Sequence, residues 1–89
     1  MNTEEKKRWV KFRQVKAKQL NTLKAQTEKL MIEMFWNQEK VYILPYWTIV
    51  LKDAHLWLED NDEMMKRITD YSVETMLTLW KRMIDAIYH

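Results

Sequence analysis

Few side chains in this sequence could carry out covalent or metal chemistry. Cysteine is absent, Ser72 is the only serine, and the histidines are His55 and the terminal His89. His55 and Glu59 are four residues apart, a spacing that on a helix could present two metal ligands, but no thiol completes a zinc site. No Ser/His/Asp or Cys/His arrangement can be assembled for nucleophilic catalysis. We therefore expect no catalytic, cofactor or metal site, and a protein that is not an enzyme.

The first half of the chain holds a basic segment that could bind a partner. Residues 6–18 contain seven Lys or Arg among thirteen positions, interleaved with Trp9 and Phe12. Such a helix can clamp phosphates, dock in an acidic protein groove or lie on an anionic membrane, and it can also be a solvated face. A protein partner is expected, nucleic acid is the alternative, and a membrane partner is not expected. The basic residues assigned to the partner-binding face are Lys7, Arg8, Lys11, Arg13 and Lys18.

Five tryptophans and seven methionines give the chain more aromatic and polarizable surface than its size requires. At helical spacing such residues are most often core, but Trp and Met are also frequent at protein-binding surfaces. The predicted aromatic anchors are Trp9 and Trp36. Trp9 lies beyond the reach of a compact bundle, and Trp36 falls on the side of its helix that carries lysines.

A cluster of acidic residues lies between the second and third predicted elements. It consists of Glu59, Asp60, Asp62 and Glu63. This acidic corner could dock a basic partner or the basic segment of another copy. Acids near a helix N-terminus also stabilise the helix dipole, so a structural role is the simpler interpretation.

The absence of glycine favours helices over tight hairpins, because no residue takes up positive φ at low cost. Apolar spacing predicts helices over about 3–40, 45–60 and 62–88. We interpret Val41–Leu44 as an extended connector and place Pro45 in the first turn of the second helix. That helix is apolar nearly all round, so Asp53 on its apolar side would be a buried carboxylate in need of a partner. A break near Asp70–Ser72 is an alternative for the third helix.

The sequence therefore predicts an all-α fold, a single domain over residues 1–89 built as a three-helix antiparallel bundle with a long N-terminal helix. The first helix is much longer than the other two. Its basic turns should consequently project from the bundle or pack against a second copy of the chain. A homodimer is predicted because a domain of this size buries its apolar surface only marginally by itself.

The charge of the chain is distributed unevenly along its length. Residues 1–30 carry nine Lys/Arg against three Glu, whereas residues 31–89 carry six Lys/Arg against ten acids. This size and composition are typical of small cytoplasmic regulators, including inhibitors encoded by phages and mobile elements. We expect a non-enzymatic protein-interaction module that binds and occludes a larger macromolecule. The alternative is a dimeric nucleic-acid-associated protein that uses the basic N-terminal helix.

Overall fold

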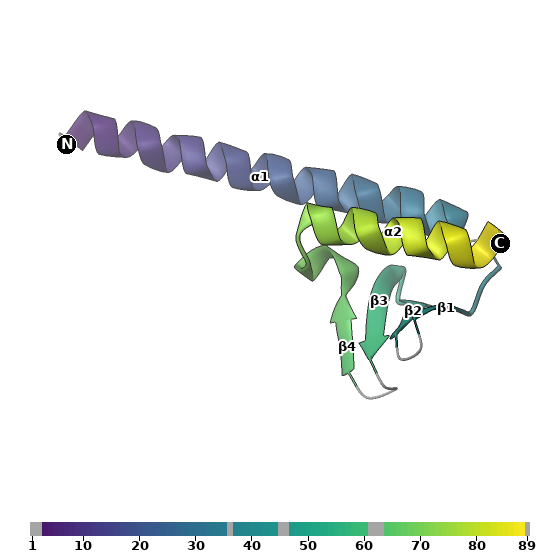
Figure 1. The fold of residues 1–89 in the computed structure, drawn as a ribbon. Helices are drawn as coiled ribbons and strands as arrows, with labels where there is room; N and C mark the ends of the chain where they lie inside the picture. The colour runs from purple at the N-terminus through teal and green to yellow at the C-terminus, as the bar shows by residue number, and fades with distance from the viewer. Residues whose placement is uncertain (1–2, 36, 45–46, 61–63, 89) are drawn as a thin grey trace.

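The computed structural model describes residues 3–35, 37–44, 47–60 and 64–88, and it has an α+β fold (Figure 1). Helix α1 (Thr3–Met34) is followed by strands β1 (Lys40–Leu44), β2 (Trp47–Lys52), β3 (His55–Asp60) and β4 (Met64–Arg67). A short 3-10 helix, η1 (Ile68–Asp70), then leads to helix α2 (Val73–Tyr88). The predicted all-α three-helix bundle is therefore wrong, because the middle of the chain forms a sheet.

The strands form one antiparallel sheet in the order β1-β2-β3-β4, each pairing with the next along the chain. Val41 lies opposite Ile49, and Ile49 lies opposite Leu58, so these three side chains form one row across the sheet. All three are buried. Cross-strand rows of aliphatic side chains stabilise a sheet and fix its register.

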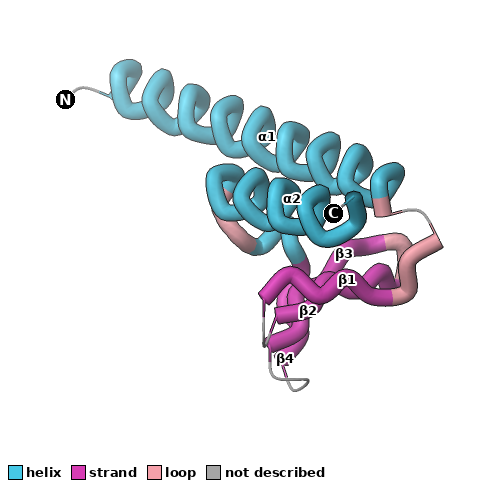
Figure 2. The backbone as a smooth tube through the Cα atoms, turned by 45° about the vertical axis from the view of Figure 1, so that its right-hand side comes forward, coloured by secondary structure: helices cyan, strands magenta, loops and turns pink. Residues whose placement is uncertain are grey.

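Both helices lie on one side of the sheet, which gives the fold two layers (Figures 1 and 2). α1 contacts β3, while α2 contacts β1 and α1. The core between the layers consists of Met31, Phe35, Val41, Ile49, Leu56, Leu58, Ile68, Met76, Leu79 and Met83. Removal of this apolar surface from water is the main force that holds the layers together. None of these core side chains comes from residues 3–23.

The helix boundaries differ from the predicted ones. α1 begins where expected but ends at Met34, and Asn37 soon afterwards has a φ of 59°. The predicted helix over 62–88 is wrong in its first part, because Met64–Arg67 is a strand. Its second part is correct: the backbone N–H of Thr75 donates to Ser72 Oγ at 3.2 Å, so Ser72 caps α2. The alternative break near Asp70–Ser72 is therefore the arrangement found.

Residues 47–60 form the β2–β3 hairpin, where a buried helix was predicted. The β-branched residues Thr48, Ile49 and Val50 suit a strand, and the burial of Leu56 and Leu58 alternates as strand side chains do. A short segment that is apolar on all sides fits a buried helix and a buried strand equally well. Periodicity alone therefore gave the wrong element. Pro45 lies outside the described residues.

The β2–β3 turn contradicts the expectation that a chain without glycine avoids tight hairpins. Its two residues, Asp53 and Ala54, both have positive φ, 54° and 61°. Positive φ at both central positions is the property of a type I′ turn, whose twist matches that of the flanking strands. Asp tolerates this region, whereas the Cβ of Ala54 costs about 1–2 kcal/mol there. Asp53 is exposed in the turn, so the buried carboxylate considered for it does not occur.

Replacing Ala54 by glycine is expected to stabilise the protein by about 1 kcal/mol, because glycine adopts positive φ without a steric penalty. Chemical denaturation of both proteins measures this difference. The matched control is Ala86→Gly in the last turn of α2, which removes the same methyl group from an exposed helical position and is expected to destabilise the protein by up to about 1 kcal/mol. A destabilising Ala54→Gly substitution would contradict the turn geometry.

Candidate partner-binding surface

The N-terminal part of α1 extends well beyond the rest of the molecule (Figure 1). We call residues 3–23 the arm and the described residues from 24 to 88 the body. Every arm residue is exposed, and the molecule measures 55 × 25 × 23 Å. The basic turns therefore extend beyond the rest of this chain (Figure 1), as both alternatives for the first helix require. A helix of about 20 residues without tertiary contacts is only marginally stable in water, so a partner could stabilise this segment considerably.

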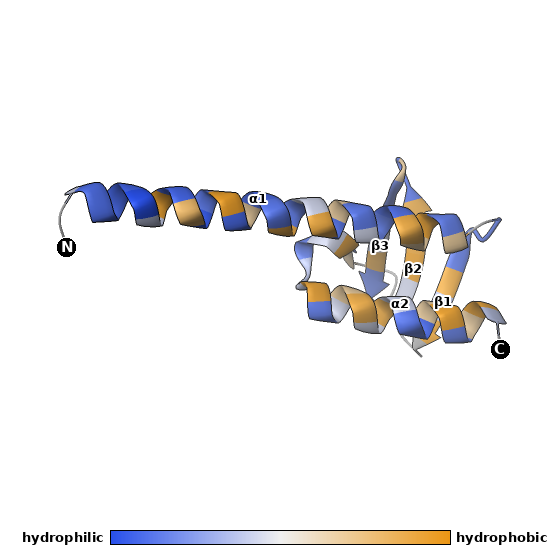
Figure 3. Ribbon diagram, turned by 90° about the horizontal axis from the view of Figure 1, so that it is seen from above, coloured by the Kyte–Doolittle hydropathy of each residue, from blue (hydrophilic) through white to orange (hydrophobic). Residues whose placement is uncertain are grey.

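The arm displays large apolar side chains that the described chain does not cover. The side chains concerned are 45–53 % exposed: Trp9, Val10, Phe12, Val15, Leu20 and Leu23. At about 100° per residue, Trp9, Phe12, Leu20 and Leu23 fall on one side of α1, and we call these four the apolar row. Figure 3 shows hydrophobic residues recurring among hydrophilic ones along the arm beyond its first turns, which are hydrophilic throughout. The exposure of Trp9 agrees with its predicted position outside the core.

Trp9 and Phe12 form an aromatic pair near the tip of the arm. Their ring centroids are 6.1 Å apart and the ring planes meet at 83°, an edge-to-face arrangement. Lys16 Nζ lies 5.5 Å from the centroid of the Phe12 ring, within cation–π range. A hollow of about 320 Å³ is lined by Arg8, Trp9 and Phe12. Two large apolar rings thus lie against each other on an open surface.

The predicted basic residues all lie on the exposed arm but not on one face. At about 100° per residue, Lys7, Lys11 and Lys18 gather on the side opposite the apolar row. Arg8 and Arg13 border the row on its two sides instead. The arm carries seven Lys/Arg against two Glu, a balance of +5. The apolar row is therefore flanked by positive charge.

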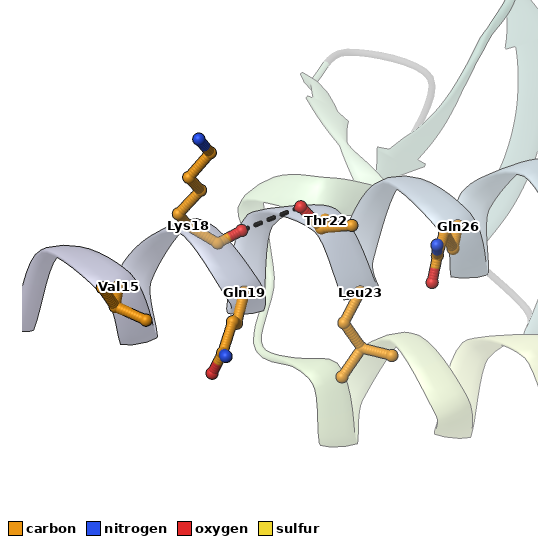
Figure 4. A pocket seen from close by; sticks show the side chains of 6 residues that line it. All are labelled: Val15, Lys18, Gln19, Thr22, Leu23 and Gln26. Atoms are coloured by element: carbon orange, nitrogen blue, oxygen red, sulfur yellow. Dashed lines mark hydrogen bonds between the residues drawn. The ribbon is translucent and has the colours of Figure 1, made fainter. Parts of the chain in front are cut away.

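A second hollow lies on α1 at the junction of the arm and the body. It has a volume of about 360 Å³ and is lined by Val15, Lys18, Gln19, Thr22, Leu23 and Gln26. In Figure 4, Gln19 and Leu23 point toward the side of α1 on which α2 lies, whereas Lys18 points away from it. Thr22 Oγ1 donates to the carbonyl of Lys18 at 2.9 Å and so leaves no free hydroxyl donor there. The Leu23 end of the apolar row thus comes close to the body.

The structure describes only part of the other predicted sites. Trp36, Asp62 and Glu63 lie outside the described residues. Glu59 and Asp60 are the last residues of β3, and Glu59 Oε2 lies 3.7 Å from Lys40 Nζ on β1. The predicted position of Glu59 and Asp60 between two helices is therefore wrong, since both residues belong to a sheet strand.

An ionic cluster around the buried carboxylate of Glu28, which the sequence did not reveal, joins α1 to the sheet. Glu28 is 5 % exposed, and its Oε1 lies 3.0 Å from His55 Nδ1 and 3.8 Å from Arg67 Nη2. Its Oε2 accepts the backbone N–H of Leu56 at 3.2 Å. Both oxygens of the carboxylate are thus occupied. The only available signal was that Glu28 is the single acid between residues 6 and 32.

His55 Nδ1 has two competing contacts in this cluster. Arg67 Nη2 lies 2.8 Å from the same nitrogen that faces Glu28. Nδ1 either donates to the carboxylate or accepts from the guanidinium, so the tautomer decides which contact is a hydrogen bond. These residues line a hollow of about 320 Å³ together with Asn21, Lys24, Ala25, Thr69 and Asp70. Because its carboxylate is fully engaged, we assign the cluster a structural role.

Tyr71 packs beside this region at the entrance to α2. Burial raises the pKa of Tyr71 above its ordinary value of 10.0, and the negative charges of Asp60 and Asp70 raise it further. Lys66 Nζ lies 4.5 Å from the Tyr71 ring centroid. The phenol is therefore protonated at neutral pH and contributes no reactive phenolate.

Neither a family model, nor a curated protein, nor a solved structure matches this chain. Within the described residues, no helix is both long and apolar enough to cross a membrane. The same residues hold no group of three or more His, Asp or Glu side chains arranged to bind a metal.

Proposed function

We propose that this protein is a small, non-enzymatic interaction module that binds a larger protein through its arm. The supporting observation is the apolar row, with Trp9 and Phe12 each 52 % exposed on a helix that the body does not cover. Buried aromatic anchors contribute much of the affinity at protein interfaces. The arm can thus hold the partner while the body occludes part of its surface, as expected of a regulator or inhibitor. A cytoplasmic location and a homodimer are further parts of this proposal.

The experiment is a tagged capture from the native host's lysate, with and without nuclease and at low and high salt. A stoichiometric protein is expected to survive both treatments and to be lost with the double substitution Trp9→Ala/Phe12→Ala, for which we expect at least about a tenfold weakening. Val10→Ala is the control, because Val10 is as exposed as the row but lies off it. Because none of these residues belongs to the core, the variants are expected to stay folded.

The alternative, a nucleic-acid-associated protein, rests on Lys7, Lys11 and Lys18 along one side of the arm. It predicts that capture disappears with nuclease and falls steeply with salt, since phosphate contacts release counterions. It also predicts that Lys7→Glu/Lys11→Glu/Lys18→Glu abolishes capture while Trp9→Ala/Phe12→Ala leaves most of it. That pattern would replace the protein-binding proposal.

A further inference from the structure

The apolar row of the arm continues a surface that already binds a helix within this chain. Met34, close to the end of α1, falls on the same side of the helix as the row. There it meets α2, where the indole N–H of Trp80 lies 3.0 Å from Met34 Sδ. α1 and α2 run side by side in the same direction, and α2 begins at Val73 near the middle of α1 (Figures 1 and 3). Beyond that point the same side of α1 has no neighbour among the described residues.

α2 shows what kind of element this side of α1 accepts. It is an amphipathic helix that buries Met76, Leu79 and Met83 at steps of three and four residues. The arm offers space for a second such helix end to end with α2, along about 30 Å at 1.5 Å per residue. α2 also protrudes on this side of α1, next to the arm. This protrusion would keep the apolar row from lying against a flat surface such as a bilayer. A single helix in line with α2 could lie beside the arm without meeting this protrusion.

The charge of the arm determines which helix fits. Arg8 and Arg13 border the apolar row, Lys16 lies within it, and the arm as a whole carries seven Lys/Arg against two Glu. The arm of a second copy would bring the same positive charge to this surface, which is unfavourable. A helix with acidic residues beside its apolar face would instead pair with these cations.

We infer that the arm binds an acidic amphipathic helix of another protein, laid along residues 3–23 and in line with α2. This inference rests on the proposed function and specifies its partner. The Trp9–Phe12 pair supplies the main anchor, because its rings are exposed and already packed edge to face. Arg8 and Arg13 supply charge complementarity, which selects acidic over basic helices.

The test uses labelled synthetic peptides of about 20 residues, stapled so that they are already helical and need no ordering on binding. The first has a row of leucines with glutamates elsewhere. A second has lysines in place of the glutamates, and a third scrambles the first so that the leucine row is broken. Fluorescence anisotropy with the full chain measures their affinities, and anionic vesicles are tested in parallel by sedimentation.

The first peptide is expected to bind at least about tenfold more tightly than the other two, and Trp9→Ala/Phe12→Ala is expected to remove this preference. Arg13→Glu/Lys16→Glu should weaken the acidic peptide and strengthen the basic one. Lys29→Glu, on the opposite side of α1, should leave the affinities for both the acidic and the basic peptide unchanged. Equal binding of the scrambled peptide or binding to vesicles alone would overturn the inference. So would a dimer that Trp9→Ala/Phe12→Ala dissociates in sedimentation velocity, because the arms would then pair with each other.

The failure of this inference can be distinguished from failure of the proposed function. If no peptide binds while capture of a host protein still depends on Trp9 and Phe12, the partner is not an acidic helix, but the arm remains its binding site. If capture is also unaffected by Trp9→Ala/Phe12→Ala, both proposals are wrong.

Discussion

Glu28→Ala is expected to lower the free energy of unfolding by about 2–3 kcal/mol, which corresponds to a fall of about 10 °C or more in the melting temperature. The substitution leaves the N–H of Leu56 without its acceptor and removes the carboxylate that faces His55 and Arg67. Losing one member of a fully buried ion pair costs about 3–5 kcal/mol, but the side chains of His55 and Arg67 are 41 % and 37 % exposed and partly screened by solvent. We therefore expect the smaller loss of about 2–3 kcal/mol in the free energy of unfolding.

Thermal and chemical denaturation measure this effect, and hydrogen exchange locates it. The amide of Leu56 should exchange faster in Glu28→Ala, while the amide of Leu58 should change less. Glu28→Gln retains a carbonyl oxygen as acceptor and should be intermediate. Glu33→Ala, an exposed acid on the same helix, is the matched control and should be nearly neutral. If Glu28→Ala is as stable as Glu33→Ala, the cluster does not stabilise the fold.

The Glu28 cluster also bears on the arm. It is one of the contacts through which α1 is attached to β3 and β4, and α1 carries the apolar row at its other end. Glu28→Ala should therefore make the orientation of the arm relative to the body more variable. A partner that contacts both the arm and the body should then bind more weakly, even though Glu28 does not touch it.

A chain that begins at Asn21 is expected to fold with a melting temperature within about 5 °C of the full chain and to lose all binding through the arm. The core side chains lie between Met31 and Met83, so the truncation removes none of them. Asn21 can itself cap the shortened helix. Circular dichroism should show a large loss of helical signal without a loss of cooperative unfolding.

The control for this truncation is Leu79→Ala in the full chain. Leu79 is 2 % exposed, and its truncation should cost about 2–5 kcal/mol by leaving a cavity in the core. The comparison shows whether the assay detects damage to the body. A shortened chain that does not fold would mean that the arm supports the body, and the separation into arm and body would be wrong.

The long first helix and its projecting basic turns could be predicted because they depend on local properties. Residues 3–23 contain no proline or glycine, so nothing in their sequence interrupts the i→i+4 hydrogen bonds. The exposure of Trp9 followed from the length of that helix. The binding roles of Trp9 and the basic residues remain predictions that the capture experiment tests.

The sheet could not be predicted by the same reasoning. Ile49, Leu56 and Leu58 fit a buried helix as well as a strand, and the choice between them depends on which segments pair. The strongest local signals for strands were the β-branched run Thr48–Val50 and the oddly placed Asp53, which lies in the turn. Met65 and Ile68 have the same helical spacing as the apolar residues of α2. The sequence pattern therefore did not show that the helix begins only after Ser72.

The sequence by itself determined the first helix, the positive charge of the arm and the absence of thiol chemistry, because these depend on residue type and on neighbours within one or two turns. The tertiary structure decided the sheet, its register and the Glu28 cluster. Glu28 and His55 are 27 positions apart, and His55 and Arg67 are 12 apart. Contacts over such separations form only when strand pairing and helix packing bring the segments together. Periodicity within one segment carries no information about that choice.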